Sequence, residues 1–193
     1  SFPIKNLNPI LLMKKFFKWT AIVVAVLAVV LFIAFKFLQY NTKKNSPEAT
    51  VEYKKDGTEL SVFYCRPSKK GREIFGGLLP YGKIWRTGAN EATTFTTNQA
   101  LSIGGKTLPA GTYTLWTIPG PSEWTVIFNS KMYGWGVNFN SEASREPEAD
   151  VLQVTVPVET LAESIEMFTI SFSEPTPSLV LAWDKTKVSV PLK

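Results

Sequence analysis

The segment PAGTYTLWTIPGP, residues 109–121, has the pattern of a β-strand flanked by two turn sequences. Its alternating positions are Tyr113, Leu115 and Thr117 on one face and Thr112, Thr114 and Trp116 on the other. Successive side chains of a β-strand point to opposite faces, so a period of two indicates a strand. Proline and glycine at 109–111 and 119–121 favour turns, which end the strand on both sides.

The same period of two recurs through residues 48–193. Further examples are residues 60–64, 154–158, 168–172 and 188–192. Turn sequences separate these segments, and Asp56-Gly57 and Gly104-Gly105 are typical of tight hairpins. We therefore predict an all-β domain, an antiparallel β-sandwich or barrel-like fold of about nine to ten strands. Residues 159–166 are the exception, because there we expect one or two helical turns.

An apolar segment precedes this domain. Residues 19–35 carry no charge, and the apolar run continues past Lys36 to Leu38. This length fits the roughly 20 residues with which a helix crosses a bilayer. The run ends in bulky residues, whereas a cleaved signal peptide ends in small ones. We therefore expect one transmembrane signal-anchor helix over 19–40, between a basic segment, 1–18, and a linker, 41–47; a cleaved signal peptide is the alternative.

The orientation of this helix depends on the lysines beside it. Lysines at 14, 15 and 18 on one side face lysines at 36, 43 and 44 on the other, so the positive-inside count is close to even. The sequence Met13-Lys14-Lys15 has the form of a bacterial start, whose free amino group adds a charge to the N-terminal side. Residues 1–12 would then lie upstream of the native start. We expect a single-pass protein of the bacterial inner membrane with its C-terminal domain, 48–193, in the periplasm.

The distribution of charge and the lack of histidine limit which partners and which catalytic mechanisms the chain can have. The chain has net charge +5, but seven cations and no acid precede Ser46, which leaves 14 cations and 16 acids beyond it. The domain is therefore slightly acidic, and we expect no nucleic-acid partner. The sequence has no histidine and one cysteine, which excludes histidine-activated nucleophiles and thiolate-cluster metal sites. We expect no cofactor and no metal, and only carboxylate chemistry stays open to an enzyme.

The segment 64–91 is the candidate site. It carries six cations and two acids in a domain that is otherwise acidic. A loop this long in a compact β-domain is more often functional than accidental, and arginine binds carboxylate or phosphate with two parallel hydrogen bonds. The residues that we predict to bind a ligand or partner are Arg66, Lys70, Arg72, Trp85, Arg86, Asn90 and Glu91, with Tyr81 as a further stacking surface. The alternative is structural: Arg72 and Arg86 pair with Glu73 and Glu91 to hold the loop.

The chain closely resembles the bacterial domain of unknown function family 2911 in residues 66–72, 74–78 and 85–93. These three stretches follow one another in the family's order, and each matches without a gap. Residues 109–115 and 123–125 continue the resemblance, which covers most of the chain after Ser46. The family is commonest in Bacteroidetes and its members are typically exported, which agrees with the orientation expected above. The resemblance implies no activity and no catalytic residue.

These features favour a membrane-anchored envelope module that binds rather than catalyses. Its 66–91 loop would contact a protein partner in an envelope complex, a glycan or another anionic ligand. Two alternatives stay open: a hydrolase with a carboxylate pair such as Glu73 and Glu91, and a structural subunit of a larger membrane assembly. The segment Tyr133-Gly134-Trp135-Gly136, together with Trp116 and Trp124, is a candidate for an aromatic platform under a sugar ring. Cys65 lies beside a cation that could make it a reactive thiolate.

Overall fold

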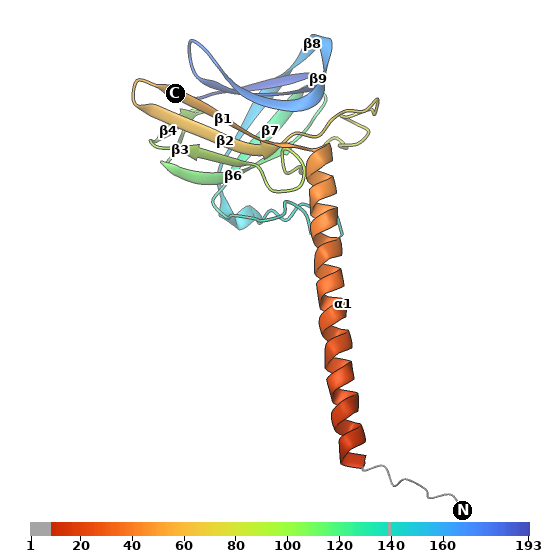
Figure 1. The fold of residues 1–193 in the computed structure, drawn as a ribbon. Helices are drawn as coiled ribbons and strands as arrows, with labels where there is room; N and C mark the ends of the chain where they lie inside the picture. Colours follow the sequence, from red (N-terminus) through yellow and green to blue (C-terminus); the bar gives the residue numbers. More distant parts are fainter. Residues whose placement is uncertain (1–8, 139) are drawn as a thin grey trace, which may run out of the picture. The chain divides into compact units, whose positions relative to one another are not determined.

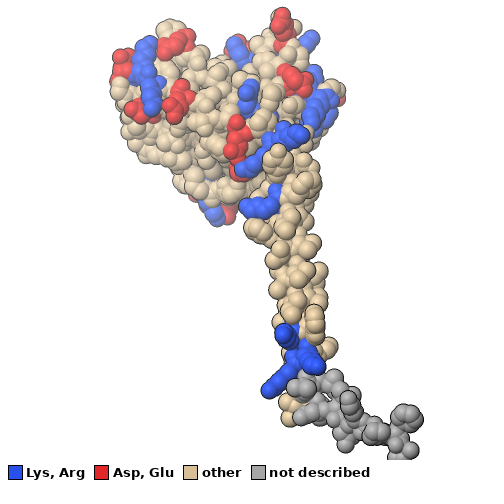
Figure 2. Space-filling view, in the orientation of Figure 1, with Lys and Arg blue, Asp and Glu red and all other residues tan. Residues whose placement is uncertain are grey.

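The computed structural model describes residues 9–138 and 140–193, which fall into two compact units divided after Thr42 (Figure 1). Helix α1 (Pro9–Asn45) confirms the predicted N-terminal apolar helix and continues past Tyr40 into the segment expected as a linker. Its part Met13–Asn45 is long and apolar enough to cross a membrane. Figure 2 shows cations at the two ends of α1 and an uncharged stretch between them.

The second unit confirms the all-β prediction. Its described residues form nine strands: β1 (Glu48–Lys55), β2 (Thr58–Cys65), β3 (Thr94–Thr97), β4 (Leu101–Ile103), β5 (Lys106–Leu108), β6 (Gly111–Ile118), β7 (Glu123–Asn129), β8 (Asp150–Ser173) and β9 (Ser178–Pro191). Seven of them make an antiparallel sheet in the order β1-β2-β3-β6-β7-β8-β9, and β4 and β5 form a separate hairpin. The predicted turns at Asp56-Gly57 and Gly104-Gly105 connect β1 to β2 and β4 to β5.

The large sheet curls so that its two ends meet. The first half of β8 pairs with β7, and the second half, from Val158 onward, pairs with β9. The β8–β9 hairpin arches over β1 and β2 (Figure 1). Several hydrogen bonds join the ends. Among them, the Ile170 N–H donates to the Tyr64 hydroxyl at 3.0 Å, and the Phe168 N–H donates to the Pro67 carbonyl at 2.9 Å. The curled sheet therefore encloses one principal core.

The predicted helical turns at residues 159–166 are wrong. This segment belongs to β8, which stays paired with β9 through register shifts between Thr160 and Ile165 and between Ile165 and Thr169. A bulge places extra residues in one strand and interrupts its alternation, so the pattern along the sequence no longer has a period of two. One short 3-10 turn, η1 (Pro147–Ala149), precedes β8.

Large aromatic side chains fill the core behind the 64–91 segment. Trp85 is 8% exposed and stacks on Trp183, with ring centroids 5.9 Å apart. It also meets the edges of Trp124 and Phe168. Aromatic pairs of this kind add stability beyond the area that they bury. Trp85 therefore anchors the middle of the 64–91 segment to the sheet.

Candidate functional site

A cleft of about 820 Å³ lies against the 64–91 segment. Four cations, Lys70, Arg72, Lys83 and Arg86, line it together with one acid, Glu142. The rest of its lining is mostly apolar and includes Leu78, Leu79, Pro80, Ile84, Trp85, Val137, Ala143 and Trp183. The cleft therefore combines a net positive charge with an apolar wall.

Arg86 is the least exposed of these four cations. Its Nε is buried, and no acceptor among the described residues reaches it. Loss of water on burial lowers the pKa of Arg86, although guanidinium stays protonated in proteins. A buried N–H group without an acceptor is costly, because the interior does not replace the water that it loses. Arg86 also lines the cleft, so its guanidinium is a candidate to bind an anion there.

Backbone pairing and close packing hold Arg86 in place. Trp85 exchanges two backbone hydrogen bonds with Thr117 of β6, at 2.7 and 2.9 Å, and its indole N–H donates to the Gly88 carbonyl at 2.9 Å. The stem of Arg86 lies against Gly136, where an added Cβ would come within 2.7 Å of the Arg86 Cβ. Only glycine at position 136 leaves room for this side chain.

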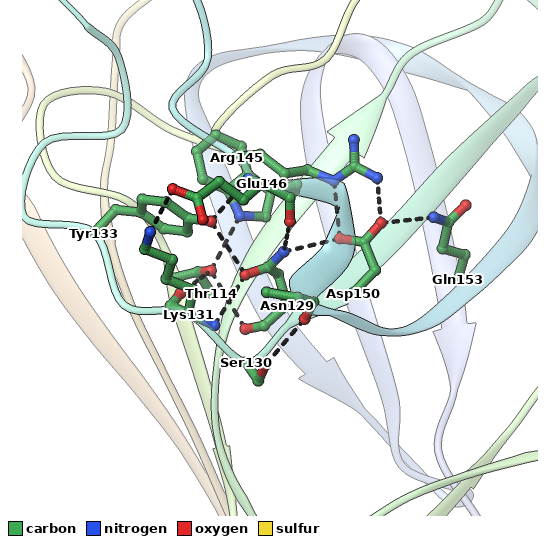
Figure 3. A network of polar contacts seen from close by, with 11 residues as sticks. Thr114, Asn129, Ser130, Lys131, Tyr133, Arg145, Glu146, Asp150 and Gln153 are labelled. Carbon is green, nitrogen blue, oxygen red and sulfur yellow. Dashed lines mark hydrogen bonds and ion pairs between the residues drawn. The ribbon is translucent and has the colours of Figure 1, made fainter.

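The segment after β7, residues 130–138 and 140–149, forms another wall of the cleft and contributes Val137 and Ala143. A polar network centred on Asn129 holds this segment (Figure 3). The fully buried Asn129 amide donates to the Glu146 carbonyl at 2.8 Å and to Asp150 at 2.9 Å. Arg145 pairs with the same Asp150 carboxylate. Burial alone would raise the pKa of Asp150, but the hydrogen bonds from Arg145 and Asn129 outweigh it and lower that pKa.

The other predicted cations take different positions. Lys70 and Arg72 line the cleft. The Lys70 ammonium donates to the Asn45 side chain at 2.8 Å, and the Arg72 guanidinium donates to the Ser68 carbonyl at 2.6 Å. Arg66 is outside the lining, because its guanidinium donates to Phe168 and Thr169 of β8 instead. The structure thus brings three of the four predicted cations to one cleft.

Glu91 and Asn90 lie outside the cleft lining as well. Glu91 pairs with Lys43 at 2.9 Å, so neither Arg72 nor Arg86 is its partner. Burial works against ionisation of Glu91, but the hydrogen bonds from Lys43, from its own backbone N–H and from Cys65 together outweigh burial and lower its pKa. The Asn90 amide is buried and donates to the Ser46 carbonyl at 3.5 Å. Glu73 is exposed and takes part in none of the ion pairs found among the described residues.

Cys65 is a buried thiol, not the thiolate that its neighbour Arg66 suggested. Its Sγ donates to Glu91 at 3.3 Å, and burial together with this carboxylate raises the pKa of the thiol to about 12. Oxygen and sulfur atoms of Glu48, Cys65 and Glu91 lie within 4.8 Å of one another, a spacing that could hold a metal ion. The Lys43 ammonium already pairs with both carboxylates and offsets one of their two negative charges.

The structure adds residues to the site that the sequence interpretation missed. Lys83 belongs to the candidate segment and could have been included, whereas Val137 carries no pattern that marks it. Two tryptophans of the predicted aromatic platform are not available to a ligand. Trp116 and Trp124 are 0% and 1% exposed, so both pack in the interior.

Comparison with known proteins identifies a family for the β-domain. The model of a family described as protein of unknown function (DUF2911) matches residues 46–192. This match begins just after α1 and spans the cleft and all nine described strands. Neither curated proteins nor solved structures gave a match. With most of its length matched, the chain belongs to the DUF2911 family of proteins of unknown function.

Proposed function

We propose that the chain is a membrane-anchored binding module whose cleft holds an anionic group at Arg86. The observation that carries this proposal is the buried Arg86 Nε, which has no acceptor among the described residues. A carboxylate or phosphate accepts two parallel hydrogen bonds from guanidinium and restores what burial removes. Lys70, Arg72 and Lys83 surround the same space and attract the same anion.

The apolar helix α1 supports the anchoring part of the proposal. Its uncharged stretch is long enough to cross a bilayer, and lysines lie on both sides of it. We place the N-terminus in the cytoplasm and the β-domain in the periplasm, as the bacterial start at Met13 and the exported character of the resembled family favour. The anionic group can then belong to a small ligand, a glycan or a protein partner of the envelope.

The carboxylates support binding over hydrolysis. A general acid needs a raised pKa, whereas Lys43 keeps the pKa of Glu91 below its usual range. Glu73 is exposed, and nothing in its surroundings gives it an apolar pocket. In an acid/base pair, one carboxyl group lies in an apolar environment and the other in a polar one. The predicted pair, Glu73 and Glu91, does not have this difference.

Calorimetric titration of the full chain in neutral maltoside micelles tests the binding proposal. The probes are inorganic phosphate, pyrophosphate and glutarate. We expect saturable binding of at least one probe, weakened by salt, and a loss of about tenfold or more in Arg86→Gln. Arg66→Gln is the matched control, since Arg66 comes from the same segment but does not line the cleft. Failure of all three probes to bind the folded protein, or equal binding by Arg86→Gln, would refute the proposal.

Extraction and N-terminal sequencing test the anchor. We expect the protein to stay with membranes after a carbonate wash and to require detergent for release. The N-terminal sequence should still contain residues 19–40. Release of a chain that begins after Tyr40 would show a cleaved signal peptide instead.

A further inference from the structure

We infer that the anion held at Arg86 is the phosphate of an anionic phospholipid from the membrane that α1 enters. This inference rests on the proposed function and names the ligand class for the same cleft. Three features of the described residues point to it: the mixed character of the lining, the place where the chain enters the domain, and exposed apolar side chains on the bordering segments.

The lining of the cleft suits an amphiphile better than a small polar anion. Four cations line the cleft, and Leu78, Ile84 and Val137 offer apolar surface in the same space. A phospholipid headgroup joins a phosphate to an acyl chain and so meets both kinds of surface. Four cations against the single acid Glu142 leave the lining positive, which favours an anionic lipid over a zwitterionic one.

The covalent chain keeps the cleft close to the membrane. Asn45 and Ser46 line the cleft, and Asn45 is also the last residue of α1. Leu38, the end of the apolar run, precedes Asn45 by seven positions, which span about 10 Å as helix and at most about 25 Å when fully extended. The short chain between the apolar run and the cleft therefore allows a lipid of the surrounding bilayer to reach it.

Exposed apolar side chains lie on both segments that border the cleft. Leu78 and Tyr81 are 43% and 45% exposed on one segment, and Met132 and Trp135 are 48% and 38% exposed on the other. Outside α1, Val151 is the one other large apolar side chain as exposed as these among the described residues. Tyrosine and tryptophan prefer the headgroup layer, where the ring is half solvated. These positions therefore suit contact with a lipid surface.

The test titrates the full chain in neutral maltoside micelles with three probes: dihexanoyl-phosphatidylglycerol, dihexanoyl-phosphatidylcholine and glycerol phosphate. We expect phosphatidylglycerol to bind one-to-one and about tenfold or more tighter than either other probe. Arg86→Gln should lose about tenfold or more of this affinity, whereas Arg66→Gln keeps it. Leu78→Ser, at an exposed position that lines the cleft, should weaken phosphatidylglycerol and leave glycerol phosphate unchanged.

Three results would overturn the inference, and they separate it from the proposed function. Glycerol phosphate binding as tightly as phosphatidylglycerol would assign the cleft to a soluble phosphate and leave the proposed function standing. Equal binding of phosphatidylcholine would show that the net charge of the lipid is not recognised. Unchanged phosphatidylglycerol binding by a folded Arg86→Gln variant would remove the site itself, and with it both proposals.

Discussion

Replacing Asn129 with alanine should loosen one whole wall of the cleft. The Asn129 side chain is fully buried and is the shared partner of two backbone groups and two side chains (Figure 3). Its amide donates to the Glu146 carbonyl at 2.8 Å and to Asp150 at 2.9 Å. Its oxygen accepts the Lys131 N–H at 2.9 Å and the Tyr133 hydroxyl at 3.4 Å. Alanine removes all four hydrogen bonds at once.

The magnitude follows from what each partner loses. Asp150 keeps Arg145 and Gln153, so its loss is small. The Lys131 N–H and the Glu146 carbonyl lose a buried partner, at about 1–2 kcal/mol each. We therefore expect Asn129→Ala to lower the free energy of unfolding by about 2–4 kcal/mol. For a domain of this size that corresponds to a fall in Tm of roughly 5–15 °C.

Urea unfolding of the full chain in neutral micelles, followed by tryptophan fluorescence, measures this loss. Hydrogen exchange should also show reduced protection confined to residues 130–149. Gln153→Ala is the matched control, because Gln153 donates to the same Asp150 from an exposed position and should cost below about 1 kcal/mol. A loss below about 1 kcal/mol in Asn129→Ala, or unchanged exchange in 130–149, would refute the reasoning.

Three further predictions concern other parts of the domain. Gly136→Ala should destabilise the domain by about 1–3 kcal/mol and weaken anion binding, because the new Cβ displaces Arg86, whereas Gly134→Ala meets open space and should stay within about 0.5 kcal/mol in denaturant titrations. Glu91 has a folded pKa below its usual value of 4.5, so it stabilises the fold above that pH and the contribution disappears as pH falls through the folded pKa. The stability difference between wild type and Glu91→Gln should therefore shrink on acidification below about 4.5, and a difference that grows would contradict the assignment. Cys65, whose thiol pKa is raised to about 12, should resist iodoacetamide at pH 8 until the protein is unfolded, and rapid alkylation of the folded protein would show that the thiol is accessible.

The strand patterns were predictable because a strand is a local feature. Residues 109–121 become β6 and its flanking turns, since the alternation reflects the two faces of a single segment. The hairpin at Gly104-Gly105 followed for the same reason, as two residues with positive φ are enough to form it. The prediction failed at residues 159–166, where bulges break the alternation and pairing with β9 keeps the segment extended.

The candidate segment could be located from charge alone, but the roles of its cations could not. Arg66 and Arg86 look alike in the sequence, yet only Arg86 lines the cleft. Arg66 instead bonds to Phe168, which lies 102 positions away on β8. Val137 lines the cleft and Gly136 packs against Arg86, although both come from a segment far along the chain.

By itself, the sequence determined the apolar helix, the all-β domain after it and the place where cations gather. Each of these depends on residues that are neighbours in the chain, through bilayer thickness, strand alternation and local charge. Only the tertiary structure decided that the Arg86 Nε is buried without an acceptor among the described residues and that Glu91 pairs with Lys43. It also brought Lys70, Arg72 and Lys83 to the same cleft. The physical reason is that burial and pairing depend on contacts between distant segments, which the curling of the sheet creates and no local pattern records.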